Sequence, residues 1–404
     1  MKKFLVTSHH FTRRILKFLF KQSSKGRKRG LDLLLMMKVL FMVFVIQCKF
    51  FVSNACTEFS LSSEDDSVVV GRSMEFIGAL GYYLVVEPRE YSHTSVPSKE
   101  CFLHSSLHWQ NKYIIAYVDV LDVLNDLDMP IATDGLNEVG LSLAANLFVG
   151  FAQFQKIPVE KCHMAVSSLQ FPLWILGNFG TVQELRDALE KDSFPLVWEA
   201  NVPEWLKGIF QLHYSIVDAS GDAIVIEFTE QGRMVFNNTL GVVTNSPPYD
   251  FHLINIRNYV ELSKSAHDAL ELGKVTFKPT GQGSGLLGIP GDFTPPSRFV
   301  RAAIMAHFSD PVKTGKEAVI KAFHILNTVD IPRGTSSDYT VWSVVKDLKS
   351  KSLYFRVYKD LTICVLHMAD AKKGQKLKMK MSECIGGFVD ITDKLTLAMV
   401  RDEL

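Results

Sequence analysis

The fold is decided by two neighbouring stretches, Asn54-Ala55-Cys56-Thr57-Glu58-Phe59-Ser60-Leu61 and Val69-Val70-Gly71-Arg72-Ser73-Met74-Glu75-Phe76. Alternating and β-branched residues in these stretches, separated by the polar run 62–66, predict a β-hairpin. Cys56 would begin the first strand, immediately after a small residue. The hairpin therefore places a cysteine where the folded part of the chain is expected to start.

Residues 1–55 are expected to be a removed signal segment. A basic region that includes Lys25–Arg29 precedes an apolar run. The uninterrupted part of that run, Val39–Cys48, is shorter than the roughly 20 residues that span a bilayer. A short apolar run with basic flanks before a small residue is typical of a signal peptide. Cleavage after Ala55 would leave residues 56–404 as a single exported domain, periplasmic or extracellular, with no stable membrane span.

Other possibilities for the two ends of the chain stay open. Met36 or Met37 would be the true start if the unusually long basic region is not translated. A lipid anchor on Cys56 is disfavoured because Ser53, not an aliphatic residue, lies three positions before it. The last four residues, Arg401-Asp402-Glu403-Leu404, resemble a retention tail, which would instead place the protein in the lumen of the endoplasmic reticulum.

A cysteine at the start of a mature chain carries a thiol and a free α-amine on adjacent carbons. The ionised thiol is a strong nucleophile. The amine, with an unperturbed pKa of about 7.7–8.0, can act as a base near neutral pH. Cys56 would then supply both nucleophile and base, as in the terminal-threonine variant of the catalytic triad. The alternative is a structural thiol or half of a disulfide.

Composition favours a large core and excludes several classes of function. Of the 404 residues, 47% are hydrophobic and the formal net charge is +1, which argues against disorder and against a nucleic-acid partner. Because His-Glu-x-x-His, paired Cys-x-x-Cys and Gly-x-x-x-x-Gly-Lys patterns are missing from the sequence, we expect no metal and no cofactor. Five cysteines follow the signal segment, and an odd number suggests one reactive thiol. The pairing of the other four stays open: Cys101, Cys162, Cys364 and Cys384.

Strand hairpins and helices alternate along the mature chain. Strands are predicted at 113–118, 213–219, 223–229, 234–237, 240–244, 339–347, 353–358 and 361–367. Helices are predicted at 172–177, 251–264, 297–307 and 316–326, and in the segment that follows a capping box at Thr181-Val182-Gln183-Glu184. Asp134–Gly140 is rich in turn residues. This order predicts an α+β domain in which helices cover antiparallel sheets.

Three polar residues stand out as candidates for a site. Arg72 lies in an apolar strand, where a charge needs a partner. It either pairs with Glu75 or another carboxylate, or contacts Cys56 and favours the thiolate. Asn245 follows a strand, where it is a turn residue or a donor to a developing oxyanion. Arg298 begins a helix, and it is either a surface residue or a charge aimed at the site.

Five ordered motifs carry a family resemblance. They are Cys56-Thr57 with Gly71-Arg72-Ser73-Met74-Glu75-Phe76, then Asp134-Gly135-Leu136-Asn137-Glu138-x-Gly140-Leu141, Val243-Thr244-Asn245-Ser246-Pro247, Gly288-x-Pro290-Gly291-Asp292 with Ser297-Arg298-Phe299, and Asp338-Tyr339-Thr340-x-Trp342. Together they resemble the choloylglycine hydrolase family, which includes conjugated bile salt hydrolases and penicillin V acylases. The resemblance implies a four-layer αββα N-terminal nucleophile fold, with two stacked antiparallel sheets, that hydrolyses linear amides.

The resemblance also implies roles for single residues. The matching positions are Cys56 for the nucleophile, Arg72 and Arg298 for the two site arginines, and Asn245 and Asn146 for the oxyanion hole. Glu75 stands where many members have Asp, which keeps the carboxylate but adds one methylene.

The expected partner is a small molecule in which an amide joins a bulky apolar acyl group to a small polar amine. The aromatic run 76–83 follows Arg72 closely, and it either lines an apolar pocket or belongs to the core. Phe76, Tyr82 and Phe148 are the candidates for substrate contact, and Phe151 would add to them. The alternative is an exported or lipid-anchored binding protein with a blocked Cys56. A homo-oligomer is left open.

Overall fold

The computed structural model describes residues 56–76, 81–120, 129–200, 202, 210–371 and 374–388. The chain divides into two compact units, residues 1–52 and 53–404, and every described residue belongs to the second. The predicted signal segment and the tail 401–404 therefore lie outside the described residues. Among the helices that are described, none is long and apolar enough to cross a bilayer.

The first sheet is built around the predicted hairpin. Its strands lie in the order β14-β1-β2-β17-β18-β19, and each neighbouring pair is antiparallel. Their bounds are β1 Cys56–Ser62, β2 Val68–Phe76, β14 Val242–Val243, β17 Tyr339–Asp347, β18 Ser352–Val357 and β19 Asp360–His367. Cys56 begins β1 and lies opposite Met74 of β2, which confirms the hairpin and the place of the cysteine in it.

The second sheet has the strand order β13-β12-β11-β8-β7-β6-β3-β20 and is also antiparallel. Its strands are β3 Tyr83–Glu87, β6 Ile115–Asp119, β7 Ala132–Asn137, β8 Ser142–Leu147, β11 Leu212–Val217, β12 Ala223–Thr229, β13 Gly232–Asn237 and β20 Leu377–Lys380. The hairpin predicted around residues 213–229 is β11 and β12. β20 was not predicted, and it pairs with β3 from far along the chain.

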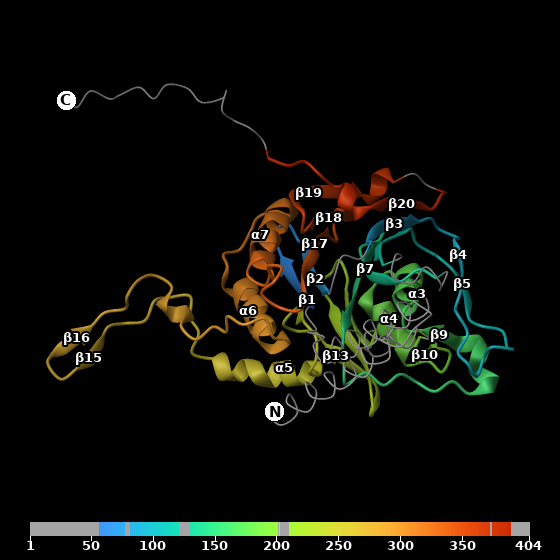
Figure 1. The fold of residues 1–404 in the computed structure, drawn as a ribbon, viewed down its shortest axis with the longest axis horizontal. Helices are drawn as coiled ribbons and strands as arrows, with labels where there is room; N and C mark the ends of the chain where they lie inside the picture. The colour runs from blue at the N-terminus through green and yellow to red at the C-terminus, as the bar shows by residue number, and fades with distance from the viewer. Residues whose placement is uncertain are drawn as a thin grey trace, which may run out of the picture. The chain divides into compact units, whose positions relative to one another are not determined.

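Helices cover the outer face of each sheet, so the domain has four layers (Figure 1). The helices on the six-stranded sheet are α6 Pro295–Phe308 and α7 Gly315–Asn327, and those on the eight-stranded sheet are α3 Phe171–Asn178 and α4 Val182–Leu189. α4 begins as its capping box predicts, because Thr181 Oγ1 accepts a hydrogen bond from the Glu184 N–H at 3.1 Å. The αββα layering is the N-terminal nucleophile hydrolase fold that the motifs implied.

Charged side chains are buried between the two sheets. Lys346 Nζ lies 2.8 Å from Asp134 Oδ2 and 3.8 Å from Glu58 Oε2. Arg72 Nη1 lies 3.6 Å from the same Asp134 oxygen. Buried charges need such partners, because each has lost its hydration. The charged cluster therefore fixes Arg72 in the space between the sheets, where the reactive residues also lie.

The turn predicted at Asp134–Gly140 is partly wrong. Asp134–Asn137 belongs to the buried strand β7, and only the residues after it form a turn. Gly135 allows a close approach of α3 to this strand, since a Cβ there would lie 2.5 Å from a Leu176 side-chain carbon. Gly140 has a φ of 98°, which explains the glycine at the turn itself.

The helix predicted over 251–264 is shorter than its sequence pattern suggests. α5 spans Tyr249–Asn255, and the 3-10 helix η4, Ile256–Tyr259, ends it. Val260 beyond it is 76% exposed, so no buried apolar face supports further turns. Several short elements were not predicted: β4 Ser92–Thr94, β5 His108–Gln110, β9 Ala165–Ser167, β10 Leu196–Trp198, β15 Leu270–Leu272, β16 Val275–Phe277, and the 3-10 helices η2 Val159–Met164, η5 Ser284–Leu286, η6 Met368–Asp370 and η7 Met381–Glu383.

Two disulfides settle the cysteine pairing that the sequence left open. Cys101 bonds to Cys162, and Cys364 bonds to Cys384. Within the described chain this leaves Cys56 as the free cysteine, and it is buried.

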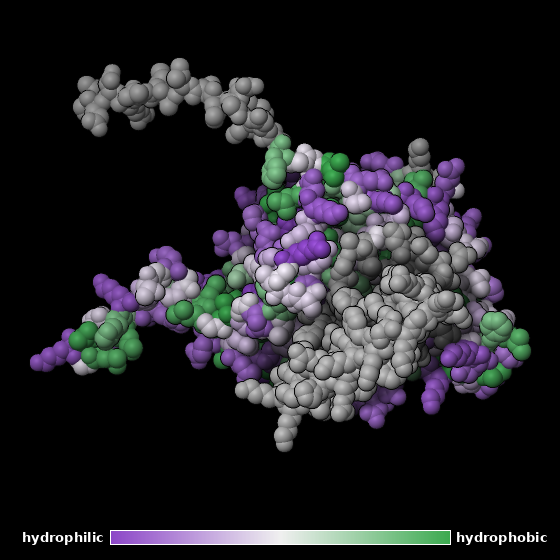
Figure 2. Space-filling model, in the orientation of Figure 1, coloured by the Kyte–Doolittle hydropathy of each residue, from purple (hydrophilic) through white to green (hydrophobic). Residues whose placement is uncertain are grey.

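The β15–β16 hairpin is exposed along both strands, and apolar side chains gather over it (Figure 2). These side chains are 53–57% exposed: Leu270, Leu272, Val275 and Phe277. These four side chains form a small exposed apolar patch, which is a candidate contact surface.

Candidate active site

Cys56 is fully buried at the start of β1, between the two sheets. Its thiol donates to Met74 Sδ at 3.5 Å, and its backbone nitrogen donates to Asn245 Oδ1 at 2.5 Å. In the full-length chain this nitrogen is still the amide that joins Ala55 to Cys56.

Arg298 reaches the backbone of Cys56 from the first turn of α6. Its Nη1 donates to Cys56 O and to Thr57 Oγ1, each at 2.6 Å. Its Nη2 donates to Asn245 Oδ1 at 2.8 Å. The side chain is fully buried, so the alternative of a surface arginine is wrong.

Arg72 lies on β2 and extends toward the eight-stranded sheet. Its Nη1 and Nη2 donate to the carbonyls of Thr133 and Ala145, at 2.6 and 2.7 Å. Its guanidinium carbon also lies 5.2 Å from the ring centre of Trp342. The carboxylate that pairs with Arg72 is Asp134 of β7, which the sequence offered only as an unnamed alternative to Glu75.

The same arginine orients Asn146. Arg72 Nε lies 3.0 Å from Asn146 Oδ1, and because an arginine nitrogen can only donate, the oxygen of this amide must face it. The Nδ2 group of Asn146 then points elsewhere, and it is buried without a hydrogen-bond partner among the described residues. Buried donors are rarely left unpaired, so this amide is available to a ligand.

Asn245 is bound on both sides of its amide. Besides its contacts to Cys56 and Arg298, it donates from Nδ2 to Leu147 O at 2.8 Å. This bond links Asn245 to the residue that follows Asn146 on β8. The structure thus brings together the six predicted catalytic positions from β1, β2, β8, α6 and the loop after β14: Cys56, Arg72, Glu75, Asn146, Asn245 and Arg298.

Burial dominates the acid–base behaviour of the Cys56 thiol. Loss of hydration raises the pKa of the thiol above its ordinary value of 9.0. The charges of Arg72 and Arg298 and the Glu75 backbone N–H act in the opposite direction, and the Glu75 carboxyl adds to the rise. The thiol is therefore protonated at neutral pH in this state, and a nucleophilic role requires a nearby base.

Glu75 is fully buried at the end of β2. Its Oε1 accepts a hydrogen bond from Thr340 Oγ1 at 2.8 Å. Burial raises the pKa of this carboxyl from 4.5 to about 7, although the Arg298 charge opposes the rise. The Cys56 nitrogen therefore donates to Asn245, whereas the Glu75 carboxyl group is bound by Thr340 of β17.

The candidate substrate residues lie at different depths. Tyr82 is buried in the same apolar cluster as Cys56, edge-on to Trp342 with 6.0 Å between ring centres. Phe76 is half-buried in that cluster. Phe148 is fully buried and stacks on His213 at 4.7 Å, so its ring supports the site from behind. Residues 77–80 of the aromatic run lie outside the described residues.

Sequence reasoning missed three residues that shape this site: Asp134, Trp342 and His213. The first two lie inside motifs that carried the family resemblance, but nothing in one sequence assigns them a partner. His213 was visible only as a polar residue in an apolar strand.

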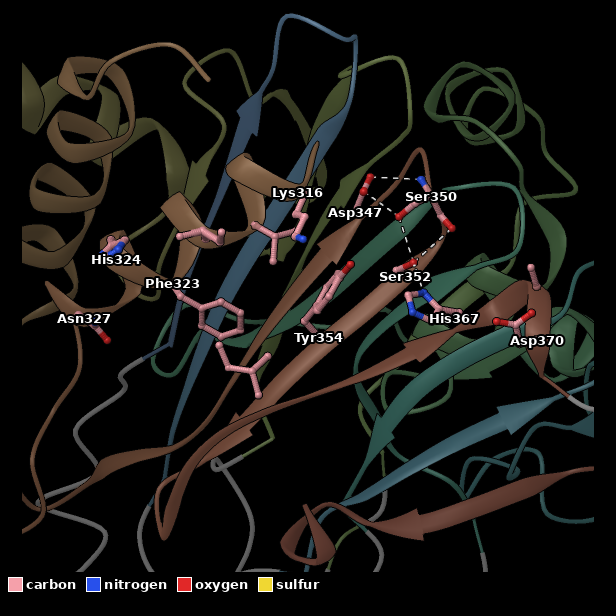
Figure 3. Close-up of a pocket in the computed structure, with 14 residues that line it drawn as sticks. Lys316, Phe323, His324, Asn327, Asp347, Ser350, Ser352, Tyr354, His367 and Asp370 are labelled. Atoms are coloured by element: carbon pink, nitrogen blue, oxygen red, sulfur yellow. Dashed lines mark hydrogen bonds between the residues drawn. The ribbon is translucent and has the colours of Figure 1, made fainter. Parts of the chain in front are cut away.

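A hollow of about 790 Å³ lies elsewhere, between α7 and the outer face of β18 and β19 (Figure 3). Its lining includes Phe323, Tyr354 and His367, and it contains none of the predicted site residues. Arg72 and Asn146 lie in the other space, between the sheets. Among the described residues, no group of three or more His, Cys, Asp or Glu side chains could hold a metal ion.

Comparison with known proteins agrees with this geometry. Residues 56–380 match the family described as linear amide C–N hydrolases, choloylglycine hydrolase family. The chain is 31% identical to a bile salt hydrolase/transferase from Clostridium perfringens over 324 residues, which cover 78% of this chain and 92% of that protein. It is 27% identical to a penicillin V acylase from Pectobacterium atrosepticum, over 75% of this chain and 78% of that protein.

Solved structures show the same likeness. A mutant conjugated bile acid hydrolase from Clostridium perfringens superposes with a TM-score of 0.71 at 28% identity, covering 82% of this chain and 98% of the other. A penicillin V acylase from Agrobacterium tumefaciens, 23% identical, shares the fold with a TM-score of 0.66, over 82% of this chain and 94% of the other. Fold and site together define an N-terminal nucleophile hydrolase. The chain belongs to the choloylglycine hydrolase family, and it is a linear amide hydrolase.

Proposed function

We propose that Cys56 becomes the first residue of the mature protein and carries out amide hydrolysis with its own thiol and α-amine. The observation that carries the proposal is the nitrogen of Cys56. It is buried, 2.5 Å from Asn245 Oδ1, beside two arginines whose charges act on the thiol. Cleavage after Ala55 would turn this amide nitrogen into an amine without moving the residue.

The proposed reaction proceeds through a thioester. The neutral amine takes the thiol proton, and Cys56 Sγ attacks the substrate carbonyl carbon. The carbonyl oxygen gains negative charge, which the unpartnered Nδ2 group of Asn146 is placed to stabilise. The carbon–nitrogen bond breaks, the leaving amine receives the proton, and water then hydrolyses the thioester to the free acid.

The proposed substrate joins a bulky apolar acyl group to a small polar amine. Tyr82, Phe76 and Met74 place apolar surface in the cluster that contains Cys56. Apolar contacts hold such an acyl group, and they discriminate by only about 1–3 kcal/mol per methylene. The relatives named as bile salt hydrolases and penicillin V acylase support the same class.

A panel of three substrates tests this proposal: a conjugated bile acid, phenoxymethyl penicillin and an N-acyl homoserine lactone. Release of free amine is measured, with Cys56→Ala as the blank. We expect turnover of at least one of the three. Activity confined to short polar amides would contradict the apolar acyl class while leaving the nucleophile intact.

The rival function is a non-catalytic binding protein with a blocked Cys56. The intact mass of the exported protein separates the two, because the enzyme must begin at Cys56 with a free amine. A lipid on Cys56, or residues remaining before it, in protein that turns over substrate would rule out the mechanism.

Export to a periplasm or to the extracellular space is part of the proposal. Two disulfides in the described chain support an oxidising compartment. The lumen of the endoplasmic reticulum also satisfies this condition, and the tail Arg401–Leu404 favours it. Fractionation of the native cell with and without these four residues decides between them, since retention that depends on the tail would overturn export.

We also propose that the protein forms a homo-oligomer through the β15–β16 hairpin. Its exposed apolar side chains support this, because monomers gain by covering such a patch. Sedimentation of the double variant Leu272→Ser/Phe277→Ser should show a smaller species than the parent. An unchanged sedimentation coefficient would exclude this surface.

A further inference from the structure

His213 lies between the two asparagines of the site. It stands on β11 directly opposite Asn146 of β8. Its Nε2 lies 3.1 Å from the carbonyl oxygen of Thr244, the residue before Asn245. Phe148, two residues after Asn146, stacks on the imidazole with ring planes only 2° apart. One side chain therefore contacts the segments that carry both asparagines.

The partners of the His213 ring show that Nε2 is a hydrogen-bond donor and that a second hydrogen is shared between Nδ1 and the Glu227 carboxyl group. A carbonyl oxygen can only accept, so Nε2 must be the donor to Thr244. On the other side of the ring, Nδ1 lies 3.0 Å from Glu227 Oε1. That oxygen also accepts the Tyr249 N–H at 3.0 Å. Glu227 therefore holds the ring in the orientation that presents Nε2–H to Thr244.

His252 binds the next carbonyl along the chain. Its Nε2 lies 2.9 Å from Asn245 O, so this nitrogen is also a donor. Burial lowers the pKa of His252 to about 4, and the ring is therefore neutral at physiological pH. Its ring stacks on Phe299 of α6 at 4.7 Å. Two consecutive carbonyls, those of Thr244 and Asn245, are thus held by two buried imidazoles.

The two histidine contacts matter because they hold the backbone that carries the Asn245 side chain. This side chain accepts a hydrogen bond from the Cys56 nitrogen through Oδ1 and donates one to Leu147 O through Nδ2. Residues 244–246 form an irregular segment after β14, so no strand ladder fixes their position. A shift of about 1 Å in a catalytic group is enough to reduce a rate strongly.

We propose that His213, held by Glu227, and His252 are positioning residues that set Asn245 at a fixed distance from Asn146 across Cys56. The inference rests on the proposed amidase function, and it assigns the two histidines no contact with substrate. Without these two hydrogen bonds, Asn245 would shift relative to Asn146 and to the Cys56 nitrogen that it binds.

Two substitutions of His213 test the proposal. In His213→Gln the side-chain amide can still donate to Thr244 O from a position near that of Nε2, whereas His213→Leu cannot donate. We expect His213→Leu to lower kcat at least tenfold, with KM changed less than twofold. His213→Gln should recover most of the loss. Intact mass must show Cys56 as the first residue in each variant.

The chain offers a matched control in His93. This histidine is also buried, lies 2.9 Å from a glutamate oxygen of Glu87, and stacks on Trp109 at 4.8 Å. His93→Leu removes the same kind of pair far from the asparagines in the chain. It should lower thermal stability, although less than His213→Leu because Glu87 keeps Lys376 and Tyr117 as partners, while leaving kcat near the parent value.

A second measurement does not depend on activity. In protein labelled with ¹⁵N-asparagine, the side-chain amide signals of Asn146 and Asn245, assigned by Asn→Ala variants, should shift in His213→Leu but keep their positions in His213→Gln and His93→Leu. If the parent turns over no amide, the proposed function fails, and these signals still decide the positioning role. Unmoved amide signals in His213→Leu, or a kcat loss no larger than in His93→Leu, would overturn it.

Discussion

The two sides of Cys56 are built differently. On one side, Arg298 and Asn245 bind the backbone of Cys56 directly, and both the oxygen and the nitrogen of the Asn245 amide have partners. On the other side, Arg72 binds two carbonyls and the oxygen of Asn146, and the Asn146 nitrogen has no partner in the described chain. Asn245 and Arg298 therefore have protein partners even without a substrate, whereas the Asn146 nitrogen has none among the described residues.

This difference separates two tasks. The Arg298 side fixes Cys56, the proposed nucleophile, because Arg298 and Asn245 form hydrogen bonds with the backbone of Cys56 itself. The Arg72 side holds a donor ready for a group that the protein does not supply. Preorganised donors of this kind need little rearrangement when charge develops on a substrate oxygen. The comparison therefore predicts that substitutions on the two sides change stability and rate in different proportions.

The largest loss of turnover is expected from substitutions of Cys56, which lies between the Arg298 side and the Arg72 side. Cys56→Ala should abolish turnover and leave the fold intact, since it removes only a sulfur atom from the core. Cys56→Ser should lose most of the activity, because a hydroxyl is a poor nucleophile beside so weak a base. Amine release and thermal unfolding measure the two properties. Near-normal turnover by Cys56→Ala would show that Cys56 is not the nucleophile.

The two asparagines give the sharpest test of the comparison. Asn146→Ala should lower kcat by about 10²–10³, or about 2.7–4 kcal/mol, if its amide donates to the oxyanion, and Asn245→Ala should cost as much if the second hydrogen of its amide also donates there. Asn245→Ala should also destabilise the fold more, because it removes one hydrogen bond each from the Cys56 nitrogen, from Arg298 Nη2 and from the Leu147 carbonyl oxygen. Equal losses of stability would contradict the proposed division of tasks. The control is Asn178→Ala on α3, which removes an asparagine that donates to the Trp174 carbonyl oxygen and is not one of the site residues.

Arg72→Lys should weaken the substrate side while keeping its charge. A single ammonium cannot reach Asn146 and two carbonyls at once, as the guanidinium does. We expect kcat to fall about tenfold and the free energy of unfolding to fall by about 1.5–3 kcal/mol, the value of one hydrogen bond to a charged group. Urea unfolding and steady-state kinetics measure these changes. A variant with parental kcat would show that Asn146 does not need this orientation.

The smallest effect is expected from Glu75→Gln, and it concerns pH. The native pKa of Glu75 is raised to about 7, so from about pH 4.5 to 7 the folded protein binds a proton that the unfolded chain has lost. The free energy of unfolding therefore declines across this range, and Glu75→Gln should flatten the decline. Urea unfolding at pH 5 and pH 8, on chains in which Ala55 is still joined to Cys56, provides the measurement. An equal slope in parent and variant would contradict a raised pKa.

Much of this protein was predictable from short stretches of sequence. Alternating residues on both sides of a polar turn predicted β1 and β2, because strand period and turn chemistry are local properties. The Thr181 capping box predicted the start of α4 for the same reason. The wrong assignments fall where burial, or the lack of it, outweighs local preference, as in the helix predicted over 251–264, which ends early because Val260 is exposed. Asp134–Asn137 contains turn-favouring residues, yet it forms a central strand because the sheet buries it on both faces.

The sequence by itself determined the chemistry available to the site: a cysteine after a small residue, two arginines in unexpected surroundings, and asparagines near strand ends. Only the tertiary structure decided which groups meet. Asp134 rather than Glu75 pairs with Arg72, the four other cysteines form two disulfides, and His213 comes to lie between Asn146 and Asn245. These contacts join residues about 20 to 70 positions apart in the chain. Strand order and register create such contacts, and no local pattern encodes them.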